Sequence, residues 1–139
     1  GFAIGQPALL DALNRIKNSF NSYPIDRLAA AGAAAAILDS EWFEENRARV
    51  LQSRQALTQG LSDLGFVVIP SSANFVFTRH PGFEGAILAK ALREKHILVR
   101  HFATPRIDQY LRITVGTDDE VRKLLSALKE IISLMGFSA

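Results

Sequence analysis

The chain has 139 residues, about the length of one domain, and 48% of them are hydrophobic, which favours a folded core over disorder. The absence of cysteine excludes disulfides, thiolate metal sites and a cysteine nucleophile, and it is typical of a reducing compartment, so we expect a cytoplasmic protein. The formal net charge of +2 and the lack of a long apolar run give no indication of a nucleic-acid or membrane partner.

The first 38 residues are predicted to form a connector helix, a turn and an alanine-rich helix. Pro7 suits the first turn of a helix over about residues 8–17, whose apolar side chains fall on one stripe: Leu9, Leu10, Leu13 and Ile16. A polar turn segment follows at residues 18–24. Asp26 is a candidate cap for the helix over residues 28–38, whose small side chains should allow close packing.

Residues 39–139 are predicted to form an α+β domain. A long helix should begin at the Asp39-Ser40 pair and stop at Gly65. The pattern then changes to strand, strand, helix, strand, strand and helix, over residues 66–69, 74–77, 86–95, 97–100, 110–115 and 117–135. This order predicts a small, mostly antiparallel sheet of about four strands backed by helices.

Two of these helices carry clear positional signals. Thr117 and Glu120 have the spacing of a capping box, and an apolar stripe at intervals of three and four residues follows them: Val121, Leu124, Leu125, Leu128, Ile132 and Met135. In the helix over residues 86–95, the side chains expected to face inward are Ile87, Leu88, Ala91 and Leu92.

Arginines at the ends of two strands are the best candidates for a binding site. Arg100 closes the apolar run of residues 97–99, and Arg112 lies inside the last strand, on the face opposite Leu111 and Ile113. The alternation of Arg112 with Leu111 and Ile113 is explained equally well if Arg112 simply lies on a solvent-exposed face of the sheet. However, Arg100, Arg106 and Arg112 fall within thirteen residues, and the planar guanidinium fork suits a carboxylate or phosphate.

Two polar residues are weaker candidates. Asn74 heads an apolar strand, and Tyr23 lies in a turn stiffened by Pro24, although an ordinary turn with a half-buried ring explains Tyr23 equally well. The three histidines are dispersed, and we predict no metal site. The phosphate-binding glycine loop and the nucleophile elbow do not occur in the sequence.

Five segments, in this order, resemble the C-terminal part of the histidinol-phosphate aminotransferases. They are Gly-Phe-Ala-Ile-Gly, Asn-Ser-Tyr-Pro, Ser-Ala-Asn-Phe, Ile-Leu-Val-Arg and Leu-Arg-Ile-Thr-Val-Gly-Thr, at residues 1–5, 21–24, 72–75, 97–100 and 111–117. These are pyridoxal-phosphate enzymes with the fold of aspartate aminotransferase. The resemblance extends over essentially the whole chain.

The resemblance implies a role for each candidate. Arg112 matches the arginine that grips the substrate α-carboxylate, and Arg100 matches a neighbour suited to the substrate phosphate; Asn74 and Tyr23 are further substrate-binding candidates. The lysine that forms the Schiff base would lie upstream of Gly1. We therefore expect no catalytic residue in this chain and little or no binding of pyridoxal phosphate by it alone.

The same resemblance implies the context of the chain. Residues 39–139 would be the small C-terminal domain and residues 1–38 the link to a missing N-terminal large domain that binds pyridoxal phosphate, in an enzyme that is a homodimer. The expected reaction is transamination between L-histidinol phosphate and 2-oxoglutarate. Two alternatives stay open: an enzyme resembling threonine-phosphate decarboxylase on the same fold, and a non-catalytic module that binds an anionic effector.

Overall fold

The computed structural model describes residues 2–20 and 23–136 of the chain. The chain divides into two compact units, Gly1–Phe43 and Glu44–Ala139. The boundary between them falls inside the long helix α3 (Ser40–Asp63), which is continuous through it. Among the described residues, no helix is both long enough and apolar enough to cross a membrane.

The first unit contains two helices, α1 (Pro7–Phe20) and α2 (Arg27–Leu38). The predicted cap is confirmed, because the Ala29 N–H donates to Oδ1 of Asp26 over 2.8 Å. The predicted turn is wrong at its start, since α1 continues to Phe20; residues 21–22 lie outside the described part of the chain. No residue of α2 is buried, so the expected close packing of its small side chains is not found.

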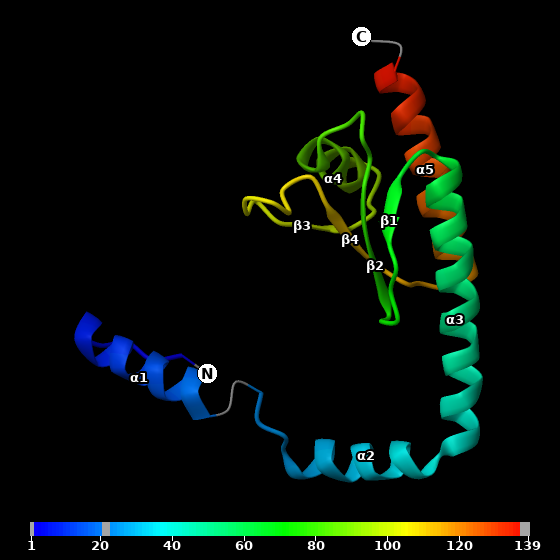
Figure 1. The fold of residues 1–139 in the computed structure, drawn as a ribbon. Coiled ribbons are helices and arrows are strands. Elements are labelled where there is room, and N and C mark those ends of the chain that lie inside the picture. The colour runs from blue at the N-terminus through cyan, green and yellow to red at the C-terminus, as the bar shows by residue number, and fades with distance from the viewer. Residues whose placement is uncertain (1, 21–22, 137–139) are drawn as a thin grey trace. The chain divides into compact units, whose positions relative to one another are not determined.

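The second unit contains a four-stranded sheet in which every neighbouring pair is antiparallel (Figure 1). The strand order across the sheet is β1-β2-β4-β3, with bounds Val67–Ile69, Phe75–Arg79, Leu111–Thr114 and Arg100–His101 respectively. The predicted α+β class and the small antiparallel sheet are confirmed. The pairing of β2 with β4 joins segments more than thirty residues apart and forms the centre of the sheet.

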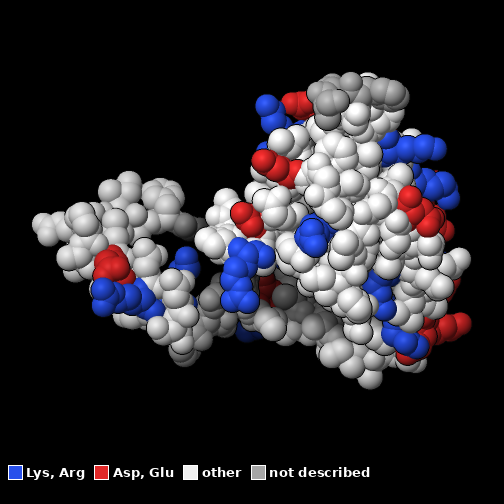
Figure 2. Space-filling model, turned by 45° about the horizontal axis from the view of Figure 1, so that its top comes forward, with Lys and Arg blue, Asp and Glu red and all other residues white. Residues whose placement is uncertain are grey.

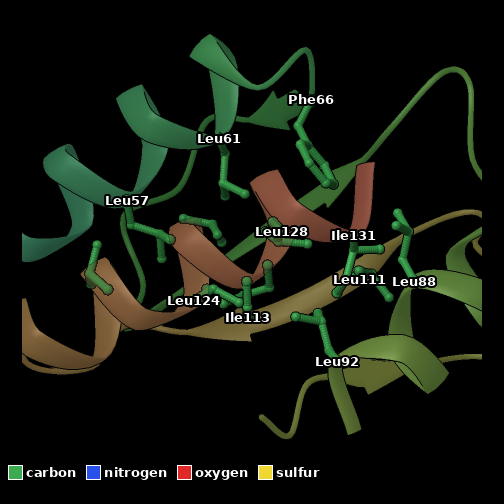
Figure 3. Close-up of a cluster of buried hydrophobic side chains, with 13 residues drawn as sticks. Leu57, Leu61, Phe66, Leu88, Leu92, Leu111, Ile113, Leu124, Leu128 and Ile131 are labelled. Carbon is green, nitrogen blue, oxygen red and sulfur yellow. The ribbon is translucent and has the colours of Figure 1, made fainter. Parts of the chain in front are cut away.

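Three helices share one core with a single face of this sheet: α3, α4 (Gly85–Glu94) and α5 (Asp118–Gly136) (Figure 3). The alternation predicted for β4 is confirmed, because Leu111 and Ile113 are buried while Arg112 is only half-buried. The helices contribute mainly leucines, among them Leu57, Leu61, Leu88, Leu92 and Leu128, all fully buried. The opposite face of the sheet is therefore left for other contacts.

The helix ends follow their sequence signals. In the capping box of α5, the Thr117 N–H donates to Oε2 of Glu120 over 2.8 Å and the Glu120 N–H donates to Oγ1 of Thr117 over 3.4 Å. At the end of α3, Gly65 adopts a positive φ of 85°, and the Phe66 N–H donates to the Leu61 carbonyl. A glycine reaches this backbone conformation without a steric penalty, which is why the helix stops there.

Two predictions in the second unit are wrong in part. The strand expected over residues 97–100 is paired only at Arg100 and His101, because the Ile97 N–H donates to the Leu92 carbonyl and closes the end of α4 instead. Ile87, expected to face inward, is 47% exposed. The buried line of α4 runs through Gly85, Leu88 and Leu92, and Ile87 lies about 100° away from Leu88 around the helix axis.

Candidate anion-binding site

The two candidate arginines lie side by side on the open face of the sheet. In the strand register, the Cα of Arg112 pairs with Arg100 on one side and with Phe77 on the other. Directly paired residues in a sheet present their side chains on the same face, and Leu111, the next residue along β4, is buried in the core. Arg100, Arg112 and Phe77 therefore form one row on the face opposite the helices.

Each guanidinium group of this row lies over an aromatic ring. The Cζ of Arg112 is 5.3 Å from the centroid of the Phe75 ring, and the Cζ of Arg100 is 5.2 Å from the centroid of the Phe102 ring. Phe77 stacks on Tyr110 with centroids 4.7 Å apart and meets Phe102 edge-on at 6.3 Å. The open face thus combines two cations with a continuous aromatic surface.

The positive charge of the row is not neutralised within the part of the chain that the structure describes. No ion pair there involves Arg100 or Arg112. The Nε of Arg112 is buried and has no hydrogen-bond partner in the structure. Like charges placed directly opposite each other destabilise a sheet, and an unsatisfied buried donor adds a cost of about 1–3 kcal/mol. An anion bound between the two groups would offset the repulsion between their charges.

Both arginines of the row border a groove. It has a volume of about 450 Å³ and is lined by Arg93, Leu98, Val99, Arg100, His101, Arg112 and Thr114. Three arginines and a histidine thus contribute to the wall, and none of its lining residues is acidic. On the face visible in Figure 2, basic and acidic side chains are interspersed.

Comparison with known proteins gives the family. Residues 1–128 match the model of the family described as aminotransferase class I and II. The chain belongs to this family. It is 58% identical over 133 residues to histidinol-phosphate aminotransferase 1 of Methylococcus capsulatus and 59% identical over 133 residues to the histidinol-phosphate aminotransferase of Gluconacetobacter diazotrophicus. Each alignment covers 96% of this chain and 37% of the relative, so the chain spans about 37% of their length.

A solved structure agrees with this assignment. The histidinol-phosphate aminotransferase from Sinorhizobium meliloti, in complex with pyridoxal-5'-phosphate, aligns with a TM-score of 0.72 and 27% identity. The alignment covers 93% of this chain and 35% of that one. The α+β fold described above is therefore the fold of the corresponding part of an aminotransferase.

The lysines of the chain are helix residues or lie next to a helix end. The Nζ of Lys95 pairs with Oε1 of Glu130 over 2.7 Å, and the remaining lysines are exposed helix residues: Lys17, Lys90, Lys123 and Lys129. None of these lysines is among the residues that line the groove. The residues that line the groove fit an anionic ligand.

The other candidate residues are not part of the arginine row. Asn74 is exposed just before β2, where its carbonyl accepts the Val115 N–H over 2.9 Å. Tyr23 belongs to the first unit and is 90% exposed. Arg106 is exposed in the segment between β3 and β4, with a positive φ of 77°. Within the described ranges, no three His, Cys, Asp or Glu side chains come together as ligands for a metal.

The aromatic residues of the site were not among the candidates from the sequence. Phe102 follows Arg100 by two positions, and residues two apart on an extended chain point to the same face, so the spacing alone could have indicated it. Phe75 and Phe77 could not be placed beside Arg112 from the sequence, because their positions depend on the register between β2 and β4. Arg93, which lies in the last turn of α4 and also borders the groove, was not among the sequence candidates.

Proposed function

We propose that this chain is the substrate-binding C-terminal part of a pyridoxal-phosphate-dependent aminotransferase that acts on L-histidinol phosphate and 2-oxoglutarate. The observation that carries the proposal is the adjacent pair Arg100 and Arg112, which face a groove and have no carboxylate partner among the described residues. The names of the relatives support the choice of substrate. Both proposed substrates carry the anionic groups that guanidinium forks bind best.

In this function, residues 39–139 form the small domain and residues 1–38 link it to an N-terminal large domain. The relatives are long enough to contain such a domain, because this chain spans about 37% of their length. Pyridoxal phosphate, held by the rest of the full-length protein, would supply the electron sink for the reaction. The complete enzyme is proposed to be a homodimer.

The chain's own contribution is binding and orientation. Arg112 would donate two parallel N–H bonds to the α-carboxylate of the amino-acid partner. Arg100, adjacent in the row, would bind the phosphate of histidinol phosphate. Fixing the anionic end of a substrate fixes the position of its reacting carbon, which lowers the entropy cost of reaching the transition state.

Replacing Arg112 in the full-length protein tests this function. Arg112→Ala should lower kcat/KM by about 100-fold or more, because a charge-assisted bidentate contact and the orientation it provides are lost together. The absorbance of bound pyridoxal phosphate should survive, since the residues that hold the cofactor are unchanged. The matched control is Arg122→Ala, which removes an exposed arginine of α5 paired with Asp119. Unchanged turnover in Arg112→Ala would contradict the proposal.

A substrate comparison separates the proposed reaction from the decarboxylase alternative. The full-length protein is given L-histidinol phosphate with 2-oxoglutarate, or threonine phosphate, in parallel assays. We expect glutamate from the first and no release of carbon dioxide from the second. The reverse result would assign the same arginine pair to a decarboxylase. Binding of an anion without turnover of either substrate would favour a regulatory module.

A further inference from the structure

We propose that Phe75 and Phe102 are positioning residues, which hold the guanidinium groups of Arg112 and Arg100 in place for an anionic ligand. The inference rests on the proposed function, because it concerns the same two arginines. It assigns a role to two residues that were not candidates from the sequence, and it identifies the interaction through which they act. The starting observation is that each arginine of the row lies over the ring of a different phenylalanine.

The distances are those of direct cation–π contacts. A guanidinium group is attracted to the face of an aromatic ring when it lies within about 6 Å of the ring centroid. The two Cζ atoms lie 5.3 Å and 5.2 Å from the centroids of Phe75 and Phe102. Both rings are half-buried, so part of each contact is shielded from water, and this strengthens the attraction.

A ring positions an arginine differently from a carboxylate. An Asp or Glu partner would occupy the N–H donors and neutralise the charge. Fewer donors and less positive charge would then be left for a ligand. The electron-rich face of a ring attracts the cation while it takes up no N–H donor. Because neither arginine forms an ion pair among the described residues, the rings are the contacts that restrict these long side chains while their charge stays available.

The rings are themselves held by neighbours. Phe102 meets the edge of Phe77, with centroids 6.3 Å apart, and Phe77 stacks on Tyr110 at 4.7 Å with an interplanar angle of 11°. Phe75 lies in β2, paired with Thr114 of β4. The position of each guanidinium group thus depends on aromatic side chains fixed in the sheet and the loop after β3. This arrangement reduces the rotamer freedom that the arginines lose when an anion binds.

The test measures anion binding by the full-length protein loaded with pyridoxal phosphate. Isothermal titration calorimetry with inorganic phosphate and with 2-oxoglutarate gives two dissociation constants for each variant. Phe102→Leu and Phe75→Leu keep an apolar side chain but remove the ring, and each should weaken binding by about three- to tenfold, as expected for a partly exposed cation–π contact. Phe102→Leu should mainly affect phosphate, and Phe75→Leu should mainly affect 2-oxoglutarate.

Two further variants distinguish positioning from a general structural effect. Phe102→Tyr and Phe75→Tyr retain the ring and should restore both dissociation constants to within about twofold of the original protein. Phe83→Leu makes the same substitution in a ring that packs against His80, away from the arginine row, and should leave both constants unchanged. A loss that the tyrosine variants do not restore would overturn the inference.

The outcomes separate the inference from the proposed function. If Arg100→Ala and Arg112→Ala weaken anion binding while both leucine variants bind normally, the phenylalanines do not position the arginines, and the proposed function stands. If the two alanine variants bind both anions as tightly as the original protein does, the arginine pair is not the anion site. The proposed function then fails, and the inference fails with it.

Discussion

His80 illustrates how a single residue acquires a role from its surroundings. It lies in the segment after β2, between the rings of Phe66 and Phe83, whose centroids are 5.0 Å and 4.8 Å from its own. Its Nδ1 accepts the Gly82 N–H over 3.0 Å, which requires that nitrogen to be unprotonated. Burial lowers the pKa of His80, opposed by a hydrogen bond to the Leu64 backbone. The folded chain therefore favours the neutral imidazole.

This environment predicts a pH-dependent stability. Because the folded pKa lies below 6.5, the contribution of His80 is fully present above pH 6.5 and is lost as the pH falls through the lower folded value. We expect the free energy of unfolding of the 139-residue chain to decrease between pH 7 and pH 5. His80→Phe keeps the ring contacts and removes the titratable group. The free energy of unfolding of this variant should therefore decrease less between pH 7 and pH 5. An equal decrease in both proteins would contradict the assignment to His80.

At the scale of elements, prediction from the sequence succeeded where local signals set the structure. The capping box at Thr117 and the stop at Gly65 each depend on a few consecutive residues, and both are confirmed. The strand over residues 97–100 was overestimated because an apolar run indicates burial without specifying a backbone partner. Ile97 and Val99 do pack against the core, but the Ile97 N–H is used by the end of α4.

The contact between α4 and the loop before β4 leads to a stability prediction. A Cβ added to Gly85 would lie 2.9 Å from backbone atoms of Gln109 and 3.1 Å from the Asp108 carbonyl oxygen. Backbone cannot move aside as a flexible side chain can, so Gly85→Ala should destabilise the chain by about 1–3 kcal/mol despite the higher helix propensity of alanine. Chemical denaturation monitored by circular dichroism measures the change.

A matched substitution serves as the control. Gly32 lies inside α2, and a Cβ there would meet nothing within 4 Å. Gly32→Ala should therefore increase helix content, with a gain of roughly 0.5–1 kcal/mol in α2. If Gly85→Ala proved as favourable as Gly32→Ala, the close approach of α4 to the loop would not be a constraint on the fold. Since Tyr110 follows this loop directly, the same contact also helps to position the aromatic surface.

At the scale of the whole molecule, the candidate site depends on pairing that the sequence does not specify. Arg100 and Arg112 could be identified from their place in apolar strands, and alternation placed Arg112 opposite the core. The pairing of Arg112 with Arg100 on one side and with Phe77 on the other follows only from the order β2-β4-β3 and its register. These pairings join distant parts of the chain, and propensity and periodicity describe only local structure.

The first unit exposes large apolar side chains that a self-sufficient fold would bury. Phe2 and Ile4 are each 91% exposed, and the predicted stripe of α1 is exposed as well, with Leu9, Leu13 and Ile16 between 55% and 66%. An amphipathic helix whose apolar side faces water gains stability when another surface covers that side. The proposed large domain would provide this surface in the complete protein.

The exposed stripe predicts that the 139-residue chain self-associates when it is produced alone. Sedimentation velocity over a range of concentrations should show a rise in average mass, because contact between stripes removes apolar surface from water. Replacing Leu9 and Leu13 by Lys should reduce this rise, since both charges would have to be desolvated in the contact. Leu98→Lys, at a position of the second unit that is 76% exposed, is the control and should leave the rise unchanged. A chain that stays monomeric at all concentrations would show that α1 does not need a covering surface.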